Sequence, residues 1–140
     1  SGRSSLFSTR SVSNETGERL TVDTVTVDAF LDGSTDVDVA KIDTEGAELL
    51  VLDGMEHTIS QARRPLTLFV EYSPSALRSA GHCPLTLIER LRQLGFEVSA
   101  VHERRRVLSR VGSDISVETL AAVAEIQGHL NLYCLRSASR

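Results

Sequence analysis

Apolar residues along the chain fall into short groups that predict strands and helices in alternation. Some groups are rich in Val, Leu and Ile and only five or six residues long, as strands usually are. These predict strands at 37–42, 66–71, 96–101 and 130–135. In the stretches between them, apolar residues recur at three- and four-residue steps, which is typical of helices. These predict helices at 47–52, 55–62, 84–94 and 117–126.

The first thirty residues have a different character. Residues 1–19 are mostly Ser, Thr, Asn, Gly and charged, with too few apolar side chains to anchor a core element, so we expect a flexible lead-in. Residues 20–30 are β-branched and loosely alternating, which favours an extended strand. The folded domain is then predicted at 20–136, followed by a tail at 137–140.

Residues typical of helix ends support the predicted bounds of the helices. Pro84 suits the first turn of a helix, and Gly95 suits its end. Ser116 is a plausible cap for the last helix. A turn is expected at 104–106, after which the chain pairs back on the strand before it.

Strands and helices that alternate at these lengths indicate the α/β class. The expected architecture is a mostly parallel sheet with helices on both faces and right-handed crossovers. Ligands of such sheets bind at the carboxyl ends of the strands. The sequence places Asp43 and Glu45 after one predicted strand and Glu71 at the end of the next. The sequence therefore predicts acidic side chains at the edge of the sheet where such proteins usually have their active site.

Charge and composition exclude several classes of function. The chain has 140 residues and a net charge of −4, and its basic residues are scattered except at Arg104, Arg105 and Arg106. We expect one domain and no nucleic-acid partner. The arginine cluster could hold an anionic substrate or partner, but a solvated hairpin tip is the favoured interpretation.

Two further features bear on where the protein works. Cys83 and Cys134 lack the spacing of a disulfide framework or a zinc site, which fits a reducing cytoplasm. No apolar stretch approaches the roughly 20 residues that a membrane helix needs. We therefore expect a cytoplasmic protein without a transmembrane segment.

Three consecutive segments resemble a family signature. Their sequences are VTVDAFL at 25–31, KIDTEGAE at 41–48 and VLDGM at 51–55. In letters, order and spacing they look like the signature of the FkbM methyltransferases. The resemblance continues to about residue 135. It implies a Rossmann-like class I methyltransferase fold, S-adenosylmethionine as cofactor, and methylation of a hydroxyl on a small molecule, sugar, polyketide or lipid.

The chain departs from the family in one respect. A complete enzyme should begin with a strand leading to a glycine-rich loop and a second strand ending in an acid that holds the ribose, whereas the nine glycines here never form G-x-G. The resemblance thus implies the C-terminal part of the fold, with the N-terminal cofactor-binding strands missing and an unpaired sheet edge. We expect the chain alone to bind S-adenosylmethionine weakly or not at all.

Two hypotheses from different classes follow. In the first, the chain is part of a working O-methyltransferase, completed by a missing N-terminal segment. In the second, it is a truncated and catalytically silent module that associates with itself or with a protein partner. A third and weaker hypothesis treats Asp43, Glu45 and Glu71 as the metal cluster of an unrelated phosphoryl-transfer domain.

Asp43, Glu45 and Glu71 are the candidate catalytic residues. A methyl group on a sulfonium is already activated, so the enzyme must align the acceptor and take the proton of its hydroxyl. The carboxylates could act as the base, or could hold Mg²⁺ that lowers the pKa of the hydroxyl. Lys41 lies on the same face of the strand as Asp43 and could pair with a carboxylate.

Structural roles for the same residues remain open. Asp43 or Thr44 could simply cap the helix that follows, and Glu71 could be a solvated strand end. Gly46 is explained better by a tight turn than by the approach of a ligand. The four histidines are dispersed through the sequence and indicate no histidine-based mechanism.

Overall fold

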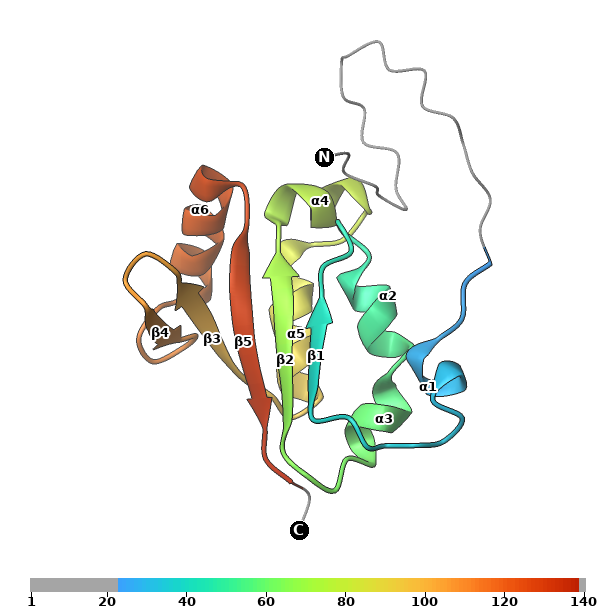
Figure 1. Cartoon of the computed structure of the whole chain (residues 1–140). Helices are drawn as coiled ribbons and strands as arrows, with labels where there is room; N and C mark the ends of the chain where they lie inside the picture. Colours follow the sequence, from blue (N-terminus) through green and yellow to red (C-terminus); the bar gives the residue numbers. More distant parts are fainter. Residues whose placement is uncertain (1–22, 139–140) are drawn as a thin grey trace.

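Five strands form one sheet in the computed structural model, which describes residues 23–138 (Figure 1). The strands are β1 (Val39–Ile42), β2 (Leu66–Tyr72), β3 (Glu97–His102), β4 (Val107–Arg110) and β5 (Leu130–Arg136). The helices are α1 (Val27–Phe30), α2 (Glu48–Asp53), α3 (Glu56–Ser60), α4 (Pro74–Ser79), α5 (Pro84–Gln93) and α6 (Val117–Gln127). The predicted lead-in at 1–19 lies outside the described residues, as do the first residues of the predicted strand at 20–30 and the last two of the predicted tail.

Beyond residue 37, the predicted strands and helices are confirmed, including the turn that folds β4 back on β3. Helix α4 was not predicted, although Pro74 occupies its first turn as prolines often do.

The strand predicted at 20–30 is wrong over its described part, because residues 27–30 form α1. Thr26 Oγ1 accepts a hydrogen bond from the Ala29 N–H at 3.1 Å and so caps this helix. A local side-chain cap thus outweighs the β propensity of the valines and threonines.

The prediction of a mostly parallel sheet is also wrong. The strand order is β1-β2-β5-β3-β4, and only the β1–β2 pairing is parallel among the described strands. The β3–β4 hairpin reverses the direction of the chain, and α6 then carries it back so that β5 runs in the direction of β4. β5 lies between β2 and β3 and is antiparallel to both.

The core lies on one side of the sheet. Leu66, Leu68 and Val70 alternate along β2 and are fully buried, whereas Phe69 between them is 37% exposed. Helix α5 lies behind the strands in Figure 1 and contacts α2, α4 and α6, so these helices form a single layer. Within residues 23–138, the prediction of helices on both faces is therefore wrong.

The face opposite the helices keeps some apolar character. Phe69 and Tyr133 are paired across β2 and β5, and their rings meet edge to face with centroids 5.6 Å apart. Val39, on the edge strand β1, is 61% exposed.

None of the helices in the described part of the chain has the length and apolar character needed to cross a membrane.

Candidate functional site

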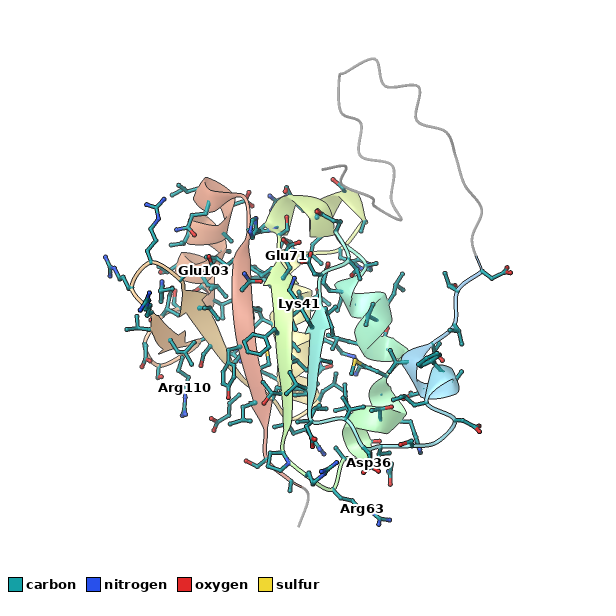
Figure 2. The ribbon with its side chains drawn as sticks, viewed as in Figure 1. Asp36, Lys41, Arg63, Glu71, Glu103 and Arg110 are labelled. Atoms are coloured by element: carbon teal, nitrogen blue, oxygen red, sulfur yellow. The ribbon has the colours of Figure 1, made fainter. Side chains whose placement is uncertain are left out.

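The candidate acids meet where β1 and β2 end. Asp43 directly follows β1, and Glu71 is the penultimate residue of β2. Because these strands are parallel, both residues come to the same edge of the sheet. Lys41 Nζ donates a hydrogen bond to Asp43 Oδ2, so the pairing of Lys41 with a carboxylate is confirmed. Figure 2 shows Lys41 and Glu71 near the same end of their strands.

Glu71 is placed where a carboxylate is costly to ionise. Its side chain is only 11% exposed. Burial raises the pKa of Glu71, and the negative charges of Asp43 and Glu45 raise it further, while His129 partly offsets them. The buried Oε2 atom of Glu71 receives no hydrogen bond from any described residue. The interpretation of Glu71 as a solvated strand end is therefore wrong.

Asp43 titrates in the opposite direction. The hydrogen bond from Lys41 lowers the pKa of Asp43 and outweighs the effect of its partial burial. Neighbouring carboxyl groups whose pKa values move apart divide their roles, because one stays ionised while the other takes up protons. Of these two acids, Asp43 is therefore the one that ionises more readily and Glu71 the one that protonates more readily.

A strained loop carries Asp43 and Glu45 from β1 into α2. Glu45 has φ 52° and Gly46 has φ 107°, so two consecutive residues lie in the left-handed region. Glu48, which is 2% exposed, holds this loop from inside. Its Oε1 accepts hydrogen bonds from Thr44 N, Thr44 Oγ1 and Gly46 N, each at 3.1 Å.

This arrangement corrects the capping hypothesis. The N-cap of α2 is Ala47, and no side chain caps the helix there. Neither Asp43 nor Thr44 has the role of helix cap. The sequence did not indicate that Glu48 binds the loop. An acid in the first helical turn, just after a glycine turn, is the signal that could have found it.

Gly46 is required by packing. A Cβ atom at this position would lie 2.7 Å from the Ala76 carbonyl oxygen in α4. The glycine lets the loop pass close to α4, which agrees with the predicted tight turn.

His129 is a neighbour of Glu71 that the sequence did not indicate. Its Nδ1 lies 3.9 Å from Glu71 Oε1. His129 precedes β5, which is antiparallel to β2, so the start of β5 meets the end of β2. This juxtaposition depends on the strand order, and so no local pattern could have found it.

The paired acids lie at the carboxyl ends of the parallel strands β1 and β2, which is where α/β sheets commonly bind ligands. Residues 1–113 match the family described as the methyltransferase FkbM domain, and the chain therefore belongs to this family. Neither the curated proteins nor the solved structures gave a match to the chain. Membership confirms the resemblance seen in the sequence and makes methyl transfer, from a donor such as S-adenosylmethionine, the class of reaction.

The described residues do not by themselves fit the methyl donor or a metal. The glycine at the site, Gly46, faces the backbone of α4 and leaves no open cradle for a ligand. Within residues 23–138, no group of three or more His, Cys, Asp or Glu side chains is arranged to hold a metal ion.

Proposed function

We propose that this chain takes part in S-adenosylmethionine-dependent methylation of a hydroxyl group on a small molecule, sugar or lipid, with Glu71 as the general base. One observation carries the proposal. In a methyltransferase-family domain, a buried carboxylate oxygen of Glu71 has no hydrogen-bond donor among the described residues. An acceptor hydroxyl placed there would supply the missing donor.

The chemistry divides between the donor and the protein. A sulfonium donor supplies a methyl group that is already activated. The protein must hold the acceptor oxygen in line and take its proton as the new bond forms. Glu71 is suited to this because burial and its acidic neighbours raise its pKa, and a stronger base takes up a hydroxyl proton more readily.

The neighbouring residues support this role. Lys41 keeps Asp43 ionised, and Asp43 in turn keeps Glu71 basic. Glu48 fixes the loop that carries Asp43 and Glu45, so both charges stay at a constant position relative to Glu71. A positioned base of this kind accelerates proton removal by about 10²–10⁴-fold.

The proposal is tested with the full-length protein expressed from its native gene. S-adenosylmethionine and S-adenosylhomocysteine are titrated calorimetrically, with and without Mg²⁺. Transfer of a labelled methyl group to a panel of hydroxylated sugars, hydroxy acids, lipids, amines and thiols is then measured. Donor binding with transfer to one class of hydroxyl is the expected result. Donor binding with transfer only to nitrogen or sulfur acceptors would refute the hydroxyl specificity.

The open sheet face favours a second candidate function, which is association. Val39 and Phe69 are 61% and 37% exposed on the side away from the helices, and β1 is the edge strand of the described sheet. Apolar side chains beside an unpaired edge favour a covering partner. A protein that binds no donor and sediments as a dimer or larger species would support this candidate over methyl transfer.

A further inference from the structure

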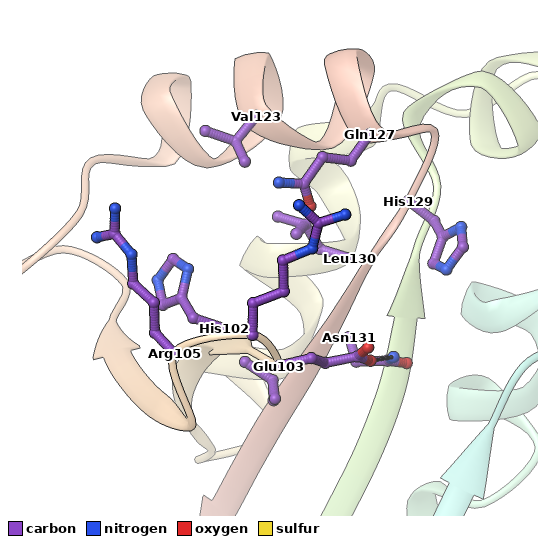
Figure 3. Close-up of a pocket in the computed structure, with 10 residues that line it drawn as sticks. His102, Glu103, Arg105, Val123, Gln127, His129, Leu130 and Asn131 are labelled. Carbon is purple, nitrogen blue, oxygen red and sulfur yellow. Dashed lines mark hydrogen bonds between the residues drawn. The ribbon is translucent and has the colours of Figure 1, made fainter.

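A pocket of about 650 Å³ lies beside the acid pair (Figure 3). It is enclosed by the turn between β3 and β4, the C-terminal half of α6 and the start of β5. Val101, Val123 and Leu130 give it an apolar part. Pockets for small molecules commonly measure about 300–1,000 Å³ and combine apolar walls with a few polar groups, so this one has the size and lining of a ligand site.

The charged groups around the pocket are mostly cationic. Arg104 and Arg105 line it from the β3–β4 turn, and neither guanidinium has an ion pair or hydrogen bond with another described residue. The one carboxylate in the lining, that of Glu103, accepts a hydrogen bond from Asn131 Nδ2 at 2.9 Å. Two permanent positive charges therefore stand at the pocket without a carboxylate partner.

Other arginines of the described chain behave differently. Each of the following forms an ion pair with at least one carboxylate: Arg64, Arg78, Arg90 and Arg110. Both arginines in the pocket lining lack such a carboxylate partner among the described residues. Because a guanidinium matches the two oxygens of a carboxylate or phosphate, an oxyanion is the ligand group that this lining recognises.

Two residues of the pocket lining are neighbours of Glu71. Asn131, in its lining, is paired with Glu71 across β5 and β2. His129 lines the pocket and also lies 3.9 Å from Glu71. Figure 3 shows His129 on the side of the pocket nearest β2. A molecule held by the arginines could therefore extend past His129 toward the Glu71 carboxylate.

We propose that this pocket binds the methyl acceptor, and that the acceptor is a small hydroxyl compound carrying an oxyanion that Arg104 and Arg105 hold. The inference rests on the proposed function and narrows its substrate class to phosphorylated or carboxylated hydroxyl compounds. The solvated hairpin tip predicted from the sequence becomes one wall of the acceptor site. Glucose 6-phosphate and glucuronate represent the two oxyanions, and glucose is their neutral counterpart.

The experiment measures binding of these three probes to the chain by calorimetric titration at constant ionic strength. We expect either glucose 6-phosphate or glucuronate to bind at least about tenfold more tightly than glucose. The better probe identifies phosphate or carboxylate as the preferred group. With ¹⁵N-labelled chain, that probe is expected to shift the amide signals of residues 102–105 and 129–131.

Two double variants with the same change in net charge test whether Arg104 and Arg105 bind the anionic probe. The double variant Arg104→Gln/Arg105→Gln should weaken binding of the better probe at least about tenfold. Arg63→Gln/Arg64→Gln makes the same change in net charge, and Figure 2 shows Arg63 at the opposite end of the sheet from Glu71. This control should bind the probe as the parent does.

Several outcomes would overturn the inference. They are equal affinities for all three probes, no measurable binding of either anion, and equal loss of affinity in the two double variants. Because no methyl donor is present in the titration, the result is independent of methyl transfer. An absence of hydroxyl methylation in the full-length protein, together with intact anion binding here, would refute the proposed function and leave the oxyanion pocket standing.

Discussion

At the scale of single residues, the loop between β1 and α2 depends on one glycine. Gly46 has φ 107°, and an added Cβ would lie 2.7 Å from the Ala76 carbonyl oxygen. We expect Gly46→Ala to lower the free energy of unfolding by about 2–4 kcal/mol, because strain and a backbone clash add together. Urea denaturation followed by circular dichroism measures the change.

Gly81 provides the matched control. It has φ 86°, and an added Cβ would meet nothing within 4 Å. Gly81→Ala should therefore cost only the backbone strain, about 1–2 kcal/mol. Equal losses in the two variants would show that contact with α4 does not hold the loop.

At neutral pH the ionised side chain of Glu71 should make the fold less stable than a neutral side chain would. Burial and the charges of Asp43 and Glu45 raise the pKa of Glu71 above the ordinary 4.5. In the pH window between 4.5 and this raised pKa, the folded chain therefore binds more protons than the unfolded chain. The free energy of unfolding then falls as pH rises through the window. We expect Glu71→Gln to be more stable than the parent at pH 7 by on the order of 1 kcal/mol, with the difference vanishing near pH 4.

Glu89→Gln is the control for this measurement, since Glu89 is exposed on α5 and its side chain has no ion pair or hydrogen bond with another described residue. Its stability should follow that of the parent at both pH values. A Glu71→Gln variant that is less stable than the parent at pH 7 would mean that the ionised carboxylate is stabilised by its surroundings.

At the scale of elements, α1 and α3 are joined by one carboxylate. Asp28 accepts hydrogen bonds from His57 N at 2.9 Å, from Thr58 N at 2.8 Å and from Thr58 Oγ1 at 2.6 Å. Asp28 thus caps α3 from a distant part of the chain. We expect Asp28→Ala to cost about 1–2 kcal/mol in thermal or urea denaturation. Asp23→Ala, at an exposed position, should cost nothing measurable.

The pH dependence of this cap has a definite sign. Burial opposes ionisation of Asp28, but the hydrogen bonds from Thr58 and His57 outweigh it and lower its pKa. The cap therefore stabilises the fold above the ordinary pKa of 3.8 and is lost as pH falls through the lowered value. The stability difference between Asp28→Ala and the parent should shrink in acid. A constant difference down to about pH 2 would contradict this role.

A comparison of α5 with α1 shows which helices the local sequence could predict. Periodicity, Pro84 and Gly95 were sufficient for α5, because an amphipathic helix carries its own pattern. α1 escaped prediction since its β-branched residues favour a strand, while Asp28 binds α3 some 30 residues away in sequence. At the site, Lys41 and Asp43 are two residues apart and their pairing was foreseen. Glu71 and His129 meet only through the strand order.

At the scale of the whole molecule, the sheet has a helix layer on one face only within residues 23–138. Leu68 and Phe69 are consecutive in β2 and face opposite sides, with exposures of 0% and 37%. We expect Leu68→Ala to cost about 2–5 kcal/mol and Phe69→Ala less than about 1.5 kcal/mol in urea denaturation. If Phe69→Ala were as costly as Leu68→Ala, the second face would have to be covered in solution, as association through it would require.

The mixed direction of the strands also follows from the whole molecule. Each segment alone is a plausible strand of a parallel sheet, and only the hairpin at 103–106 followed by α6 sets the direction of β5. That reversal brings His129 and Asn131 to the end of β2 beside Glu71. The direction of one strand therefore places the pocket next to Glu71.

The most direct test of Glu71 as general base is the pH dependence of kcat/KM for hydroxyl methylation by the full-length protein. The rate should fall in acid as Glu71 is protonated, at a pKa above the ordinary 4.5, and Glu71→Gln should lower it by about 10²–10⁴-fold without weakening donor binding. Glu97→Gln should keep the parent rate. A Glu71→Gln enzyme with the full rate and an unchanged acid limb would show that another group takes the proton.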